Sequence, residues 1–159
     1  MPDVNTAPQT AKYAPAVAPS AADVKAGRIE KPIIFFDGVC GMCNTFVNLA
    51  LRVDTKRKFL YAPLQGETAK ALLPPLPADP KDWSMIYLDE KGCHEQSDAS
   101  LEVYRRLGGL WWLLSLGRFV PRFIRNPMYR LIAHNRYRIF GKHDVCRIPT
   151  PEERARFLP

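Results

Sequence analysis

The sequence has no run of about 18 to 20 uncharged apolar residues, so it predicts no conventional transmembrane helix. It also lacks the basic start and following apolar stretch that make a secretory signal. We therefore expect a cytoplasmic protein in a reducing compartment. Its 159 residues include only four cysteines, which excludes a disulfide-stapled small domain. In a reducing compartment, cysteines are more often free, catalytic or metal-bound than paired in structural disulfides.

Acidic residues become scarce toward the end of the chain. Residues 1–100 contain 11 Lys/Arg and 12 Asp/Glu, whereas residues 101–159 contain 12 and 4. A basic region of this kind favours an acidic partner, such as nucleic acid, an anionic membrane surface or an acidic protein. The alternative is a solvated helix face with arginines at the helix ends.

Three regions are expected. Residues 1–31 are rich in Ala and Pro and offer too little apolar surface to offset the entropy of ordering, which predicts a disordered leader. Residues 32–109 are expected to form the folded core. Residues 110–159 are expected to form a basic helical extension that packs on this core.

The core predicts an α/β fold, a mixed four-stranded sheet with flanking helices. Apolar runs and turn residues predict the strands, and apolar residues at helical spacing predict the helices. The expected strands are 33–36, 58–64, 83–88 and 93–96, and the expected helices are 41–53, 66–73 and 97–107. In the extension we expect helices over 110–120 and 127–140, with Pro127 at a first helical position.

The segment with recognisable chemistry is FDGVCGMCN, residues 36–44. Cys40 and Cys43 lie three apart at a helix start, on one face of the first turn, where their sulfurs can form or open a disulfide. The free N–H groups and positive dipole at this helix end favour the Cys40 thiolate, which predicts Cys40 as nucleophile and a better-shielded Cys43 as resolving thiol. Asp37 ends the buried strand beside them and is a candidate to exchange a proton with Cys43. The alternative is that Asp37 only caps the turn or the helix.

These residues resemble the signature of the DCC family of predicted thiol-disulfide oxidoreductases, named for its Asp, Cys and Cys. The similarity extends through YAPLQGETA (61–69), SDASLEVYRRLGG (97–109) and NRYRIFGK (135–142), with Cys146 following. The resemblance implies a thioredoxin-like fold and dithiol–disulfide exchange at Cys40 and Cys43. The match to thioredoxin is looser, because thioredoxins usually have Trp before the first cysteine and Pro between the two. They also have a cis-proline before the third strand, for which the nearest candidate here is Pro80.

The predicted activity is therefore exchange of the Cys40–Cys43 dithiol with protein or small thiols. The expected partners are a thiol or disulfide substrate and an external reductant, and no bound cofactor or metal is required. A zinc-stabilised interaction module, with Cys40, Cys43, His143 and Cys146 as ligands, is an alternative. Disulfide exchange between Cys146 and Cys40 is another. Cys93 is expected to be a packed or surface thiol on an outer strand.

Residues 110–140 suggest a further alternative, in which the thiols are incidental and the chain is a scaffold for a membrane or protein partner. The run LWWLLSL (110–116) is too short to span a bilayer, but it suits an interface with Arg118, Arg122 and Arg125 toward anionic headgroups. A buried helix over the sheet is the competing interpretation. No RNA-recognition, helix-turn-helix or zinc-finger pattern accompanies the arginines, so no nucleic-acid partner is expected.

Overall fold

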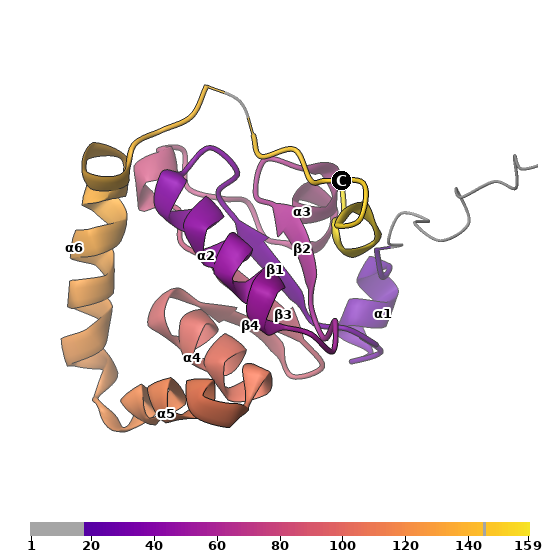
Figure 1. The fold of residues 1–159 in the computed structure, drawn as a ribbon, viewed down its shortest axis with the longest axis horizontal. Helices are drawn as coiled ribbons and strands as arrows, with labels where there is room; N and C mark the ends of the chain where they lie inside the picture. The colour runs from indigo at the N-terminus through magenta and orange to yellow at the C-terminus, as the bar shows by residue number, and fades with distance from the viewer. Residues whose placement is uncertain (1–17, 145) are drawn as a thin grey trace, which may run out of the picture.

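The fold is built on a mixed four-stranded sheet flanked by helices (Figure 1). The computed structural model describes residues 18–144 and 146–159. The strand order is β2-β1-β3-β4, in which β1 is parallel to β2 and antiparallel to β3, and β4 is antiparallel to β3. The strands span Ile33–Phe36 (β1), Leu60–Pro63 (β2), Ile86–Asp89 (β3) and Gly92–Glu95 (β4). This confirms the predicted α/β architecture of thioredoxin-like type.

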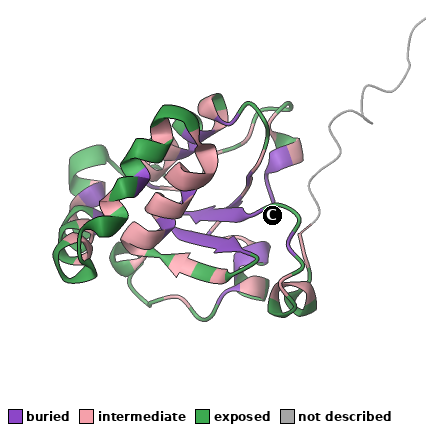
Figure 2. Cartoon of the chain, turned by 90° about the horizontal axis from the view of Figure 1, so that it is seen from below, coloured by how far each residue is buried: buried purple, intermediate pink, exposed green. Residues whose placement is uncertain are grey.

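Strand β1 is buried on both faces, which explains its unbroken apolar sequence (Figure 2). Ile34 and Phe36 face a core formed with α2 (Gly41–Val53) and α4 (Gln96–Leu107). Ile33 and Phe35 face a second core that includes Ala69 and Leu73, from α3 (Glu67–Leu72) and the residue after it. The two-residue period of a strand assigns these side chains to alternate faces. The predicted helix 41–53 is confirmed residue for residue.

The residues before β1 are more ordered than their composition predicts. Residues 1–17 of the expected leader lie outside the described residues. Beyond them, helix α1 (Ala21–Lys25) begins at Ser20, whose hydroxyl accepts the Asp23 N–H while the Asp23 carboxylate reaches back to Ser20. Ile29 is buried in the α3-side core. Where the composition predicts disorder, residues 18–31 thus contain a capped helix, and Val24 and Ala18 pack against the same core as Ile29.

The helical region after residue 109 differs from its prediction in two ways. Residues 109–119 form short helical turns, with only Trp112–Ser115 (α5) in α conformation. Helix α6 (Arg122–Phe140) begins before Pro127, which lies inside the helix. Pro127 and Phe123 are both exposed, so water can bind the carbonyl that proline leaves without a partner. No helix among the described residues is both long and apolar enough to cross a membrane.

The described residues after α6 form an irregular segment with turns and one short 3-10 helix, Arg154–Arg156. We call residues 141–144 and 146–159 the C-terminal strap, which runs from the end of α6 to the edge of the sheet formed by β2 (Figure 1). The Leu158 N–H donates to the Tyr61 carbonyl over 2.8 Å, beside strand β2. The guanidinium of Arg156 pairs with the buried carboxylate of Asp54, at the end of α2. The strap therefore ties the last residues to the core.

Candidate active site

The site lies where β1 ends and α2 begins. The chain leaves the sheet at Phe36, turns through residues 37–39 and enters α2 with Cys40 as its N-cap. The Cys40 Sγ accepts the Cys43 N–H over 3.4 Å, as a capping side chain does. Both cysteines are free thiols. The predicted placement of the pair at a strand-to-helix junction is confirmed.

The two thiols have opposite acidities because each is the other's hydrogen-bond partner. The hydrogen bond from the Cys43 thiol is the largest cause that lowers the pKa of Cys40, to about 7. The same hydrogen bond, together with burial, raises the pKa of Cys43 well above its ordinary value. At neutral pH the site therefore contains a substantial fraction of Cys40 thiolate beside a Cys43 thiol.

Cys40 is less exposed to solvent than Cys43, which is the opposite of the prediction. Cys40 is fully buried, whereas Cys43 is partly exposed. The backbone after α6 lies against the motif: Gly41 N–H donates to the Gly141 carbonyl over 3.2 Å, and His143 N–H donates to the Val39 carbonyl over 2.8 Å. These contacts make an antiparallel bridge between Cys40 and Lys142. The prediction that Cys43 is better shielded is wrong in this respect, since it considered only the depth along α2 and not the returning chain.

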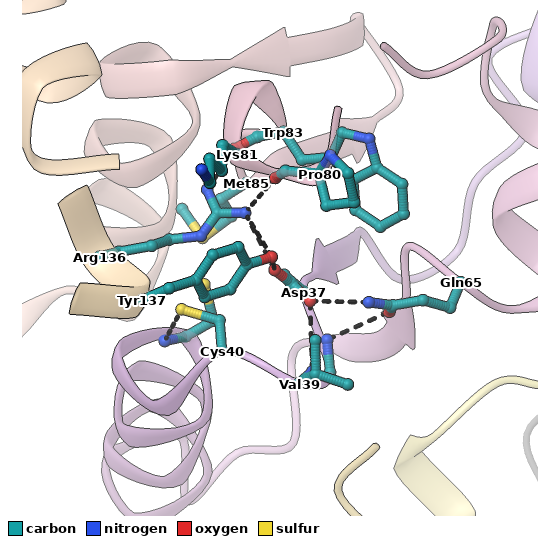
Figure 3. Close-up of polar contacts among 12 residues, drawn as sticks. Asp37, Val39, Cys40, Gln65, Pro80, Lys81, Trp83, Met85, Arg136 and Tyr137 are labelled. Carbon is teal, nitrogen blue, oxygen red and sulfur yellow. Dashed lines mark hydrogen bonds and ion pairs between the residues drawn. The ribbon is translucent and has the colours of Figure 1, made fainter. Parts of the chain in front are cut away.

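Asp37 is the centre of a buried polar network (Figure 3). Its Oδ2 accepts from Arg136 Nη2 over 2.9 Å and from the Tyr137 hydroxyl. Its Oδ1 accepts from Gln65 Nε2 over 2.7 Å and from the Val39 N–H over 3.2 Å. The Val39 contact confirms that Asp37 caps the turn. With four accepted hydrogen bonds, the acceptor positions of the carboxylate are filled.

Arg136 is the site residue that the sequence interpretation missed. It lies on α6 with a side chain only 2% exposed, and its positive charge lies near both sulfurs and lowers their pKa values. Its guanidinium also donates to the carbonyls of Pro80 (2.7 Å) and Trp83. Pro80 is in the trans form, because the described residues contain no cis peptide bond. Arg136 thus joins the segment before β3 to Asp37.

Two further residues complete this network. Gln65, in the loop after β2, also accepts the Gly38 N–H with its Oε1 over 3.2 Å, so it bridges both sides of the turn. Burial raises the pKa of Tyr137 to about 12, so its hydroxyl remains a donor at neutral pH. Gln65, Arg136 and Tyr137 all lie in segments that carry the family resemblance, which is the only signal of their role in the sequence.

The other predicted thiol and imidazole groups lie at different places. Cys146 is close to the motif, because a Cβ on Gly38 would come within 2.5 Å of its Sγ. Burial, followed by the charge of Asp37, raises the pKa of Cys146. His143 is exposed, and no three His, Cys, Asp or Glu side chains within 18–144 and 146–159 are grouped to hold a metal ion. The four residues of the zinc alternative therefore form no such group, and Cys93 is an exposed thiol on β4, as predicted.

Comparisons with known proteins agree with this geometry. A family model described as DCC1-like thiol-disulfide oxidoreductase matches residues 34–142. The chain is 37% identical over 134 residues to the uncharacterized protein YuxK of Bacillus subtilis, covering 83% of this chain and 97% of YuxK. It is 33% identical over 121 residues to a chloroplastic DCC family protein of Arabidopsis thaliana, covering 75% of this chain and 70% of that protein. No solved structure matches the chain.

Proposed function

The chain belongs to the DCC1-like thiol-disulfide oxidoreductase family, and from this premise we propose that it exchanges its Cys40–Cys43 dithiol with the disulfides of proteins or small thiols. The single observation that supports this proposal most is the acidity of Cys40. A cysteine that caps a helix, accepts a hydrogen bond from a neighbouring thiol and has a pKa of about 7 is a competent nucleophile at neutral pH.

The exchange proceeds in two steps. The Cys40 thiolate attacks one sulfur of a substrate disulfide, and the other sulfur leaves as a thiolate, which produces a mixed disulfide. Cys43 then loses its proton and attacks the Cys40 sulfur, which releases the second substrate thiol and closes the Cys40–Cys43 disulfide. The substrate gains two electrons and the protein loses two, so a dithiol reductant must restore the protein. The steps run in reverse when the substrate is the dithiol.

Ionisation decides which sulfur attacks first. Exposure alone favours Cys43, because Cys40 is fully buried. A thiol whose pKa lies above about 9 is less than about 1% ionised at pH 7, whereas a thiol with a pKa near 7 is about half ionised. The greater intrinsic reactivity of a more basic thiolate offsets only part of this difference. We therefore assign the attack to Cys40, with a displacement of residues 140–143 that admits the substrate.

Asp37 has a positioning role in this proposal. Its carboxylate holds the Arg136 guanidinium and the Val39 turn, and its four hydrogen bonds leave no free acceptor position for a proton from Cys43. Direct proton exchange with Cys43 stays a prediction. The partly exposed Cys43 can instead release its proton to water.

Trapping with oxidised glutathione tests the order of attack. In the Cys43→Ser variant the mixed disulfide cannot resolve, so a glutathione adduct should accumulate on Cys40. The Cys40→Ser variant should form an adduct on Cys43 at least tenfold more slowly, and Cys93→Ser serves as the matched control for an exposed thiol outside the site. Peptide mass spectrometry locates each adduct. Faster labelling of Cys43 than of Cys40 would contradict the assignment.

A redox titration tests the function itself. Across a series of glutathione buffers, the peptide that contains residues 40–43 should lose two protons in a single transition, with Cys93 outside that transition. A peptide that stays reduced in a strongly oxidising buffer would refute the proposed exchange.

The Asp37→Asn variant separates the two roles of Asp37. The negative charge of Asp37 raises the pKa values of both thiols, so its removal should shift the pH–rate profile of exchange to lower pH. If Asp37 is also the proton acceptor for Cys43, the closing step should in addition slow at every pH.

A further inference from the structure

Helices α5 and α6 lie at the outside of the molecule, away from the sheet (Figure 1), and carry many large apolar side chains that are exposed. Phe119 and Phe123 are 79% and 77% exposed, and Trp112 is 49% exposed. We call this surface the α5–α6 face. Its other large exposed apolar residues are Leu113, Leu114, Leu116, Val120, Ile124, Met128, Leu131, Ile132 and Ile139. Soluble proteins rarely leave so many neighbouring apolar groups in water without a partner for them.

Helix α6 packs on the rest of the protein with one side only, which leaves its opposite side exposed. Ala133 and Arg136 are buried, and α6 packs with this side against α2, α4 and the turn Pro80–Asp82. The buried-helix interpretation of residues 110–116 is therefore wrong for its exposed members, such as Leu110, Leu113 and Leu114. Among the described residues, nothing covers their outer surface.

The charge of the same region selects the kind of partner. Residues 112–140, from the start of α5 to the end of α6, contain six arginines and no Asp/Glu. Arg118, Arg130 and Arg138 are exposed beside the apolar groups. Arg122 and Arg125 are both paired with Asp98, and Arg125 also donates to Ser97, so Arg125 has a structural role that the sequence interpretation did not assign.

We propose that the α5–α6 face binds the surface of an anionic lipid bilayer, with its apolar side chains in the interface and its arginines on the headgroups. Apolar and aromatic groups interleaved with arginine on short helices are the chemistry that such surfaces bind. A second copy of this chain fits the face poorly, because it would bring two strongly basic surfaces together. This proposal is independent of the thiol chemistry.

Vesicle co-sedimentation tests the proposal with the full chain. The unaltered protein should pellet with vesicles of phosphatidylcholine and phosphatidylglycerol in a three-to-one ratio. It should stay in solution with phosphatidylcholine alone, and binding to the anionic vesicles should weaken at about 0.5 M salt. Tryptophan emission should shift to the blue on binding, and a Trp112→Phe variant should lose most of that shift. Absence of binding to the anionic vesicles at low salt overturns the proposal and leaves the face to a protein partner.

Two pairs of variants separate the apolar from the charged contribution. Phe119→Ser with Phe123→Ser should weaken binding at least tenfold, whereas Leu49→Ser with Ile148→Ser, exposed apolar residues elsewhere, should not. Replacing three arginines by Gln should weaken binding by about a hundredfold, at about fivefold for each, while the same change at three exposed lysines should have much less effect. The arginines are Arg118, Arg130 and Arg138, and the lysines are Lys25, Lys31 and Lys56.

The outcomes are distinct from those of the thiol experiments. Binding of the Phe119/Phe123 variant equal to that of the unaltered protein overturns the assignment of the face. Sedimentation velocity without vesicles should show a monomer. A dimer that the Phe119/Phe123 variant abolishes would assign the face to a second copy and overturn the proposal. Thermal unfolding of each variant verifies that it is folded before its binding is compared.

Discussion

Arg136 Nη2 lies 2.9 Å from Asp37 Oδ2 although 99 residues separate them in the chain, and both side chains are only 2% exposed. The pair joins the motif to the last helix. The two charges also have opposite effects on the thiols, because Arg136 lowers the pKa values of Cys40 and Cys43 and Asp37 raises them. A buried charge that loses its partner is costly, so this pair allows a direct test.

Replacing Arg136 by Met should destabilise the protein by about 3–5 kcal/mol, because Asp37 is left buried without a countercharge. It should also raise the pKa of Cys40, since a positive charge near the thiolate is removed. Urea unfolding and the ultraviolet absorbance of the thiolate measure the two effects. Arg138→Met, an exposed change on the same helix, should stay within about 0.5 kcal/mol of the unaltered protein.

The rate of exchange with a small disulfide should rise with pH through about 7 and then level off. Only the thiolate of Cys40 attacks, and its ionised fraction increases as pH passes its pKa of about 7. Stopped-flow measurements of the first mixed-disulfide step report this profile. A rate that continues to rise above pH 9 would identify Cys43, whose pKa is raised, as the attacking sulfur.

The hydrogen bond between the thiols can be removed without changing Cys40. In Cys43→Ala the pKa of Cys40 should move up toward the ordinary thiol value of about 8.5, because the side-chain donor is lost. Cys43→Ser retains a hydroxyl donor and should show a smaller change. An unchanged thiolate titration in Cys43→Ala would show that the helix end, and not Cys43, sets the acidity.

Gly41→Ala should expose Cys40. An added Cβ would lie 2.2 Å from the Phe140 carbonyl oxygen, so the backbone after α6 must move away from the motif. We expect alkylation of Cys40 to be at least tenfold faster than in the unaltered protein. Residues 140–143 are then already displaced, so they no longer have to move away before the reagent reaches Cys40. Gly117→Ala is the matched control, because its Cβ would meet only the flexible end of Leu101. Equal rates in both variants would mean that residues 140–143 do not control access.

The last buried ion pair allows a stability test far from the thiols. Arg156→Met should cost about 3–5 kcal/mol, because it leaves the carboxylate of Asp54 buried and unpaired at the end of α2. Arg154→Met, an exposed change two residues earlier, should have almost no effect on the free energy of unfolding. Similar losses in both variants would indicate that the strap contributes through its backbone contacts instead.

Local sequence patterns were sufficient to predict those elements that depend on residues close together in the chain. The apolar run of β1 and the spacing of Phe46, Val47 and Ala50 determine a strand and a helix, and both were predicted. The same local evidence placed Cys40 and Cys43 together at the helix start. Local evidence was not sufficient for Pro127, which lies inside α6 rather than at its start, because packing of the helix on the core outweighs the hydrogen bond that proline loses.

Contacts between residues far apart in the chain could not be predicted from the sequence. Nothing in the spacing of Arg136 distinguishes it from the exposed arginines of α6, since only the fold brings its guanidinium to Asp37. The burial of Cys40 likewise depends on Gly141 and His143, a hundred residues later in the chain. Patterns of hydrophobicity record which face of an element is buried, but not which distant segment buries it.

The return of residues 136–143 to the motif has a consequence for biosynthesis. At about 5 to 20 residues per second, a ribosome needs on the order of 5 to 20 s to proceed from Cys40 to Arg136. Until residues 136–143 have been made and have folded back, the nascent polypeptide lacks the backbone that covers Cys40. Each newly made molecule thus passes through a stage without this cover, which ends when the segment after α6 has folded onto the motif.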